Sequence, residues 1–167
     1  MSIEIERKYI ISIPDFEVLK AQESYEASKI LQIYLDSEEG ITHRVRKREF
    51  LDRTSFTETK KIRIDKMSAI EEEREISAED FERLSKNVKE GTRPLIKARH
   101  TFCFGDLCFE IDVYPEWVDS CIMEVELDSV GQDVCIPPFI RVIEEVTGNK
   151  KYSNSSMSKK FPEESTV

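Results

Sequence analysis

Hydrophobic and polar residues alternate along most of the chain, which is the pattern of β-strands with one buried face. The alternating segments are rich in Ile, Val, Phe, Tyr and Thr. They predict eight strands, over residues 3–11, 30–36, 41–48, 54–64, 71–77, 94–104, 107–113 and 121–128. Short connections such as Gly105-Asp106 join several of them, so we expect antiparallel hairpins.

Three helices are predicted between or after these strands. Residues 15–23 follow Pro14, and proline is favoured at a helix start. Residues 78–89 follow Ser77, a residue type that caps helix N-termini. A third helix is predicted over 138–147, because apolar residues recur there at helical spacing, at Phe139, Val142, Ile143 and Val146.

Length and composition indicate one domain and exclude several classes of protein. We expect a single domain over residues 1–161 and a flexible polar tail over 162–167. The net charge of −9 and the pI near 4.9 argue against a nucleic-acid-binding protein, which would present a basic surface. No run of about 18 apolar residues and no signal-peptide pattern occurs, so a cytoplasmic protein without a membrane partner is expected.

The chain contains four cysteines, Cys103, Cys108, Cys121 and Cys135. They form no C-x-x-C pair of the kind that zinc sites use. Several lie in apolar, strand-like segments. We therefore predict reduced, buried thiols.

Charged residues occupy every second position of nearly every predicted strand. Alternate residues of a strand share one face, so each row lies on one side of the sheet. A solvent-facing side explains any single row, but such a side normally mixes the two signs. The rows here are mostly of one sign: basic at Arg44, Arg46 and Arg48 and at Lys97 and Arg99, acidic at Glu73 and Glu75, at Glu110 and Asp112, and at Glu124 and Glu126.

Rows of like charge repel one another unless opposite rows or a ligand compensate them. A closed barrel would bring the rows together across its interior. We therefore predict an α+β fold: an eight-stranded antiparallel closed β-barrel, a tunnel with a charged interior and helices packed outside. The apolar outer face would carry Ile3, Ile5, Val45, Phe109, Ile111, Val113, Ile122 and Val125.

Such an interior favours one kind of ligand. Arginine guanidiniums match phosphate oxygens in geometry, so the basic rows predict a polyanion. The acidic rows would repel it unless Mg²⁺ or Mn²⁺, which prefer oxygen ligands, lies between them. The charge pattern therefore predicts metal-assisted chemistry on a phosphate chain.

The stretch Glu4-Ile5-Glu6-Arg7-Lys8 resembles the E-x-E-x-K signature of the CYTH superfamily, the triphosphate tunnel metalloenzymes. The resemblance continues in the family's order through LQIYL, HRVRKR, ETKK, EEREI, IKARH, FEIDVY, MEVEL and VTGNKKYSN, over residues 3–154. The family includes bacterial inorganic triphosphatases, thiamine triphosphatases, class IV adenylyl cyclases and fungal RNA triphosphatases. Its fold is an eight-stranded antiparallel tunnel, and the chain looks most like the short bacterial triphosphatases.

The resemblance implies a role for each group of tunnel residues. The divalent metals, Mg²⁺ or Mn²⁺, would be held by Glu4, Glu6, Asp112, Glu124 and Glu126. Further acidic residues of the tunnel would be Glu73, Glu75 and Glu110. The triphosphate would be bound by Arg44, Arg46, Lys60, Lys97 and Arg99. Lys8 and a partner tyrosine, Tyr34, would tune or deliver the attacking water.

The function predicted from these roles is metal-dependent hydrolysis of inorganic triphosphate, or of a similar small triphosphate such as ATP or thiamine triphosphate. Two alternatives stay open: an adenylate cyclase on the same fold, and a module that binds polyphosphate or nucleotides without turnover. The family also suggests a homodimer. Lys150 and Lys151 have two equal interpretations, as basic residues over a tunnel end or as cations at a helix C-terminus.

Overall fold

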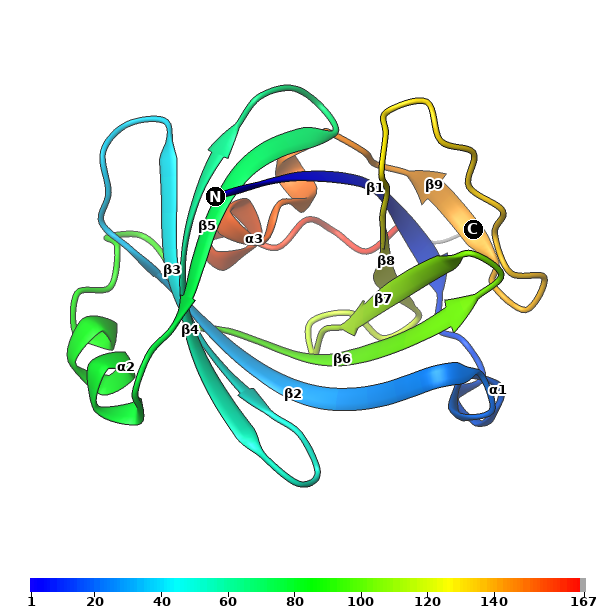
Figure 1. Cartoon of the computed structure of the whole chain (residues 1–167), viewed down its shortest axis with the longest axis horizontal. Coiled ribbons are helices and arrows are strands. Elements are labelled where there is room, and N and C mark those ends of the chain that lie inside the picture. The colour runs from blue at the N-terminus through cyan, green and yellow to red at the C-terminus, as the bar shows by residue number, and fades with distance from the viewer. Residues whose placement is uncertain (166–167) are drawn as a thin grey trace.

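The computed structural model describes residues 1–165, which form a β-barrel with short helices around it (Figure 1). The strands are β1 (Ser2–Ser12), β2 (Glu23–Leu35), β3 (Ile41–Glu49), β4 (Thr54–Arg63), β5 (Ser68–Glu75), β6 (Leu95–Phe104), β7 (Leu107–Val113), β8 (Ser120–Glu126) and β9 (Val142–Glu145). The helices are α1 (Phe16–Lys20), α2 (Ala78–Ser85) and α3 (Asn154–Lys159), with one 3-10 turn, η1 (Lys150–Tyr152). Within residues 1–165, no helix has the length and apolar character needed to cross a membrane.

Eight of the strands close into an antiparallel barrel in the order β5-β4-β3-β2-β6-β7-β8-β1. β1 closes it by dividing its length: residues 2–5 pair with β5, and residues 6–12 pair with β8. β9 adds to β1 as a ninth strand. The predicted fold class, an eight-stranded antiparallel closed barrel, is confirmed.

Alternation along the strands places charge inside and apolar side chains outside. On β3, Arg44 and Arg46 line the internal cavity, while Val45 between them is fully buried under Phe81 of α2. On β7 and β8, Phe109 and Val125 belong to a second outer cluster. The barrel therefore has the inverted arrangement that the charge rows predict.

One end of the interior is apolar. A cluster that we call the apolar plug fills it, made up of Ile10, Leu95, Tyr114, Trp117, Ile122, Val146, Tyr152 and Met157. Ile122 was predicted to face outward, and that prediction is wrong, because it shares the strand parity of Glu124 and so points inward. The plug closes the tunnel from the side of η1 and α3 and leaves the charged cavity above it.

The predicted helix over 138–147 is wrong. Residues Val142–Glu145 form β9, whose Glu145 lies opposite Tyr9 of β1. A short apolar run fits either a helix or a strand, and the free edge of β1 supplies the backbone partners that decide for the strand. The sequence also gave no signal for α3, a short helix rich in serine.

Two residues of the predicted tail, Pro162 and Glu164, make hydrogen bonds to the barrel. Trp117 Nε1 donates a hydrogen bond to the carbonyl of Pro162 at 3.1 Å. The Glu164 carboxylate accepts hydrogen bonds from the backbone N–H groups of Asp119 and Ser120, both at 2.6 Å. Residues 166 and 167, also part of the predicted tail, lie outside the described residues.

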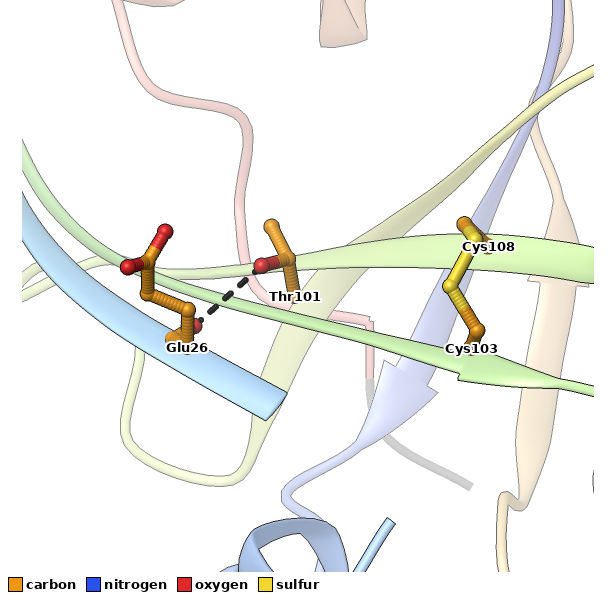
Figure 2. The surroundings of a disulfide bond; sticks show 4 residues. All are labelled: Glu26, Thr101, Cys103 and Cys108. Atoms are coloured by element: carbon orange, nitrogen blue, oxygen red, sulfur yellow. Dashed lines mark hydrogen bonds between the residues drawn. A yellow bond between two sulfur atoms is a disulfide. The ribbon is translucent and has the colours of Figure 1, made fainter. Parts of the chain in front are cut away.

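Cys103 and Cys108 form a disulfide, so the prediction of four reduced, buried thiols is wrong (Figure 2). They lie directly opposite each other on β6 and β7, with Cα atoms 4.0 Å apart. Thr101, two residues before Cys103 on β6, donates a hydrogen bond to the carbonyl of Glu26 at 3.3 Å. Cys121 is free and buried, and Cys135 is free and exposed.

Candidate functional site

The charged cavity occupies about 600 Å³ of the barrel interior. All eight barrel strands contribute side chains to it, and the segment Val146–Ser156 lies along one side. The strand alternation that buries the outer apolar face forces these polar side chains inward. The cavity therefore holds many ionisable groups at close quarters.

A basic wall is formed by Arg44, Arg46 and Arg48 of β3. Arg46 donates two hydrogen bonds to Gln32 Oε1, at 3.1 and 3.0 Å, and Arg48 donates one to Ser28 Oγ at 2.8 Å. The Nε of Arg44 is buried without a hydrogen-bond partner in the described structure. These contacts are to neutral groups, so the positive charge of the wall is not balanced within it.

Burial and neighbouring positive charges lower the pKa of Arg46. The charges are those of Arg44 and Arg99, and the lowered pKa is about 9. A lowered pKa means that the charged form is held at a cost. A bound anion would remove that cost.

An acidic wall faces the arginines, formed by Glu4, Glu6, Glu71, Glu124 and Glu126. Burial and a hydrogen bond shared with Glu4 raise the pKa of Glu71 to about 7. Burial and the charge of Glu124 raise the pKa of Glu6 well above its usual range. Burial and the neighbouring carboxylates Glu4, Glu110 and Glu124 also raise the pKa of Glu126. Part of this wall therefore retains protons near neutral pH.

The acidic wall has the donor chemistry that a hard divalent cation requires. Lys61 Nζ lies 3.1 Å from Glu4 Oε2, but that buried oxygen accepts no hydrogen bond from the described residues. Carboxylates that share protons can exchange those protons for a cation. Within residues 1–165, no three such side chains already converge at coordination distances. The acidic wall therefore fits a divalent cation by the type of its ligand atoms and by its negative charge.

Lys8, the predicted catalytic lysine, lies at the border between the cavity and the apolar plug. Its Nζ lies 3.3 Å from Glu124 Oε1 and donates a hydrogen bond to the carbonyl of Tyr152 at 3.1 Å. Burial opposes its charge, but Glu124 and Glu6 raise the pKa of Lys8 above its usual range. Tyr34, its predicted partner, accepts a hydrogen bond from Gln32 Nε2 at 2.7 Å instead.

Beneath the cavity, Lys97, Arg99 and Asp112 form a compact ion cluster that we call the floor triad. Arg99 makes two hydrogen bonds to Asp112, at 2.7 and 2.9 Å, and Lys97 Nζ lies 2.8 Å from the same carboxylate. Burial alone would raise the pKa of Asp112, but the two cations hold it well below its usual range. Asn154 of α3 accepts hydrogen bonds from Lys97 and Tyr114, which ties the triad to the plug.

The floor triad changes how three predicted site residues are placed. Lys97 and Asp112 do not line the cavity, and their charged groups lie 2.8 Å apart. Burial and the charges of Arg99 and Arg46 still lower the pKa of Lys97 to about 7. Arg99 does line it and also donates to Glu110 Oε2 at 2.9 Å. Glu110 and Glu73 line the cavity as predicted, whereas Glu75 lies outside its lining.

The prediction that Lys60 lines the tunnel is wrong. Lys60 is exposed, and its neighbour Lys61 takes the inner position, paired with Glu4. Because Lys60 and Lys61 are adjacent, the alternation along β4 allows either lysine to be the inward one. Glu58 faces outward, where it contacts His43 Nε2 at 2.7 Å and forms an ion pair with Arg74.

The cavity lining also includes Lys61 and Glu71, which were not assigned a role from the sequence. Arg48 lines it too, with the parity of Arg44 and Arg46 that the predicted basic row gives it. The position of Glu71 depends on the β4–β5 register, which pairs Lys61 with Glu71. Of the two lysines with two interpretations, Lys150 lines the cavity, and it is the first residue of the 3-10 turn η1 rather than a residue at the C-terminus of a helix.

We compared the chain with known protein families, curated proteins and solved structures. No family model and no curated protein matches the sequence. The crystal structure of the inorganic triphosphatase NE1496 is 29% identical, over 97% of this chain and 98% of that one, with a TM-score of 0.61.

More distant structures share the fold alone. PH1819 from Pyrococcus horikoshii OT3 is 17% identical, over 76% of this chain and 80% of its own, with a TM-score of 0.58. HpAC1 from Hippeastrum, a putative adenylyl cyclase described as having a dominant triphosphatase activity, is 12% identical, over 75% and 80% of the two chains, with a TM-score of 0.53. The similarity to NE1496 supports the predicted resemblance to CYTH-type inorganic triphosphatases, and the two more distant structures support the fold alone.

Proposed function

We propose that this protein hydrolyses inorganic triphosphate, or a similar small triphosphate, to phosphate and pyrophosphate with the help of Mg²⁺ or Mn²⁺. One observation carries the proposal. Of the three inward arginines, Arg46 and Arg48 donate to neutral groups, and the Nε of Arg44 has no partner in the described structure; a wall of crowded carboxylates faces them across a cavity of about 600 Å³. A phosphate chain with bound divalent cations would satisfy both walls at once.

The similarity to a solved structure supports this choice of substrate class. The similar structure NE1496 is described as an inorganic triphosphatase, and the chains align over nearly their whole lengths. No serine or cysteine nucleophile is needed, because phosphoryl transfer depends mainly on positioning and charge stabilisation. The cavity supplies both.

The residues of this chain would divide the work by position. Arg44 and Arg46 would bind the phosphate oxygens and stabilise the charge that develops on the leaving group. Glu4, Glu6, Glu124 and Glu126 would hold the metal, which when bound neutralises phosphate charge and lowers the pKa of water. Lys8 keeps Glu124 ionised through its close ion pair, and Arg99 orients Glu110.

The experiment that tests this proposal is a product assay on the purified full chain. Triphosphate, ATP and thiamine triphosphate are each offered with Mg²⁺, with Mn²⁺ and with EDTA, and phosphate, pyrophosphate and cyclic AMP are measured. We expect metal-dependent release of phosphate and pyrophosphate from triphosphate. Cyclic AMP from ATP would instead identify a cyclase, and tight triphosphate binding without turnover would identify a binding module.

A further inference from the structure

β2 separates two basic rows of the barrel interior, and its own inward side chains carry no charge. It lies between β3, which carries the three arginines of the basic wall, and β6, which carries the two cations of the floor triad. In the floor triad, a carboxylate lies between the cations. The inward positions of β2, which share the parity of the cavity residue Tyr34, are instead Ser28, Ile30, Gln32 and Tyr34.

Gln32 contacts the basic wall from behind the cavity. Its side chain is fully buried and does not line the cavity. It lies opposite Arg46 of β3, and its Oε1 accepts hydrogen bonds from Nε and Nη2 of Arg46, at 3.1 and 3.0 Å. Its Nε2 donates a hydrogen bond to Tyr34 Oη at 2.7 Å. Both ends of the amide are therefore engaged by residues that line the cavity.

The chemistry of the three groups fixes the direction of these bonds. A guanidinium has donors only, so the amide oxygen of Gln32 has to face Arg46. The amide nitrogen then faces Tyr34, and because it is a donor, the phenol oxygen has to accept. Within residues 1–165, the hydroxyl proton of Tyr34 meets no acceptor of its own. Since Tyr34 lines the cavity, that proton is available to a ligand there.

The same amide holds Arg46 without neutralising it. Its oxygen engages two guanidinium nitrogens, while Nη1 has no hydrogen-bond partner within the described part of the chain. Burial and the charges of Arg44 and Arg99 lower the pKa of Arg46 to about 9, so the positive charge is not balanced by its neighbours. A carboxylate in place of the amide would pair with Arg46 and cancel the charge that attracts a phosphate.

We propose that Gln32 is a positioning residue of the triphosphate site, which directs the Arg46 guanidinium and the Tyr34 hydroxyl proton toward the same bound phosphate chain. The inference rests on the proposed function, because it assigns a role in binding that substrate. Gln32 does not touch the ligand and acts through the two residues that it holds. Tyr34 is then a hydrogen-bond donor to a phosphate oxygen.

The first test is triphosphate binding by Gln32→Glu. A carboxylate of the same size neutralises Arg46 and offers Tyr34 an acceptor in place of a donor, so the phenol proton turns away from the cavity. We expect the dissociation constant for triphosphate, measured by calorimetry with EDTA present, to rise about tenfold or more. With Mg²⁺ or Mn²⁺, the same loss should appear mainly in KM, because both contacts are already made to the bound substrate.

The matched control is Gln22→Glu, the same change in the turn between α1 and β2. Gln22 lies outside the cavity lining, where its Nε2 donates to the carbonyl of Val18. This variant should bind and hydrolyse triphosphate like the wild type. Circular dichroism and the thermal midpoint establish that each variant is folded.

A double variant tests whether Gln32 acts through Tyr34. Tyr34→Phe alone should weaken triphosphate binding by about fivefold or more, because a hydrogen bond to an anion is lost. Added to Gln32→Glu, it should cost no more than about twofold, because the phenol proton has already been turned away. Gln32→Asn, one methylene shorter and unable to reach both partners, adds no charge and should weaken binding in the same direction. It carries the same test if Gln32→Glu does not fold.

A spectroscopic signal separates positioning from a purely structural role. In protein with isotope-labelled tyrosine Cζ, the NMR signal that Tyr34→Phe lacks belongs to Tyr34. That signal should shift when triphosphate binds to the wild type, and it should shift much less in Gln32→Glu at saturating triphosphate.

The possible results distinguish this role from the proposed function. Unchanged binding by folded Gln32→Glu, independent losses in the double variant, or a Tyr34 signal that does not respond to triphosphate would each overturn the role of Gln32 and leave triphosphate hydrolysis in place. A wild type that neither binds nor hydrolyses triphosphate would overturn both.

Discussion

The open cavity and the floor triad are both built from inward-facing charges, yet they treat those charges in opposite ways. In the floor triad, Asp112 is bound by two cations at 2.7 to 2.9 Å and is buried. In the cavity, the buried Nε of Arg44 has no hydrogen-bond acceptor among the described residues, and burial and neighbouring carboxylates raise the pKa of Glu6, Glu71 and Glu126. Removing one partner of a buried ion pair leaves an uncompensated charge, whereas charges without a partner are already retained at a cost in stability. We therefore expect substitutions in the floor triad to lower stability, and substitutions in the cavity to affect the proposed activity.

The largest effect on activity is expected at Glu126. Glu126→Gln removes a carboxylate whose pKa is raised by burial and by its acidic neighbours, so the fold should not lose stability. If it holds the metal, turnover should fall by about 10³-fold or more, a barrier increase of about 4 kcal/mol. Phosphate release and calorimetric titration with Mn²⁺ measure the two consequences. Glu82→Gln on the exposed face of α2 is the control, and normal metal binding by Glu126→Gln would remove this residue from the metal site.

The floor triad should respond in stability. Asp112→Ala leaves Lys97 and Arg99 buried without their shared carboxylate, and removing one partner of a buried ion pair costs about 3–5 kcal/mol. Urea unfolding measures this cost, with Asp133→Ala, at an exposed loop position, as the control. A loss below about 1 kcal/mol, the range of exposed ion pairs, would show that the triad does not support the fold.

The same comparison explains what the sequence could predict. Alternation assigns a side chain to the inside or the outside, and it placed Glu4, Arg44 and Glu124 correctly in the interior. It does not tell whether an inward charge meets a partner, which is why Asp112 was grouped with the other acidic residues. That distinction depends on depth in the barrel and on Asn154, which arrives from a helix without a sequence signal.

Two other differences arise from contacts between distant segments. Which residues of β4 face inward is decided by the ion pair between Lys61 and Glu4 and by the outward contact of Glu58 with His43. Both involve residues on other strands, so the sequence of β4 alone does not predict them. The Cys103–Cys108 disulfide depends on the β6–β7 register, which places the two residues directly opposite each other. Local pattern therefore predicts faces, and pairing across strands decides partners.

Arg46→Gln tests the basic wall of the cavity. Loss of a charge-stabilising group in an active site typically costs about 10²–10³ in rate. Burial and repulsion from Arg44 and Arg99 lower the pKa of Arg46. The variant removes the buried charge and this repulsion, so the unfolding free energy should stay the same or rise. Lys47→Gln is the matched control, since Lys47 is adjacent on β3 but pairs outside with Glu49. A stability loss like that of Asp112→Ala would erase the distinction between the two regions.

The smallest effect is expected at His100, which lies on the outer side of the wall next to Arg99 of the floor triad. Its ring packs 4.8 Å from that of Phe16, and its Nδ1 lies 2.8 Å from Tyr25 Oη. Burial lowers the pKa of His100, so the unfolded chain takes up the proton first as the pH falls through about 6.5. The histidine therefore contributes stability above that pH and loses it below.

Raised carboxylate pKa values, such as that of Glu71 at about 7, act in the opposite direction, since they stabilise the fold as the pH falls. The contribution of His100 is therefore measured as a difference between wild type and His100→Gln. Thermal midpoints of both chains between about pH 5 and 8 bracket the histidine titration. The wild type should lose more stability than the variant on going from pH 8 to 5. If the thermal midpoints of the two chains changed with pH by the same amount, His100 would be protonated equally in the folded and unfolded chains. Its surroundings on the outer side of the barrel wall would then not disfavour the charged imidazolium.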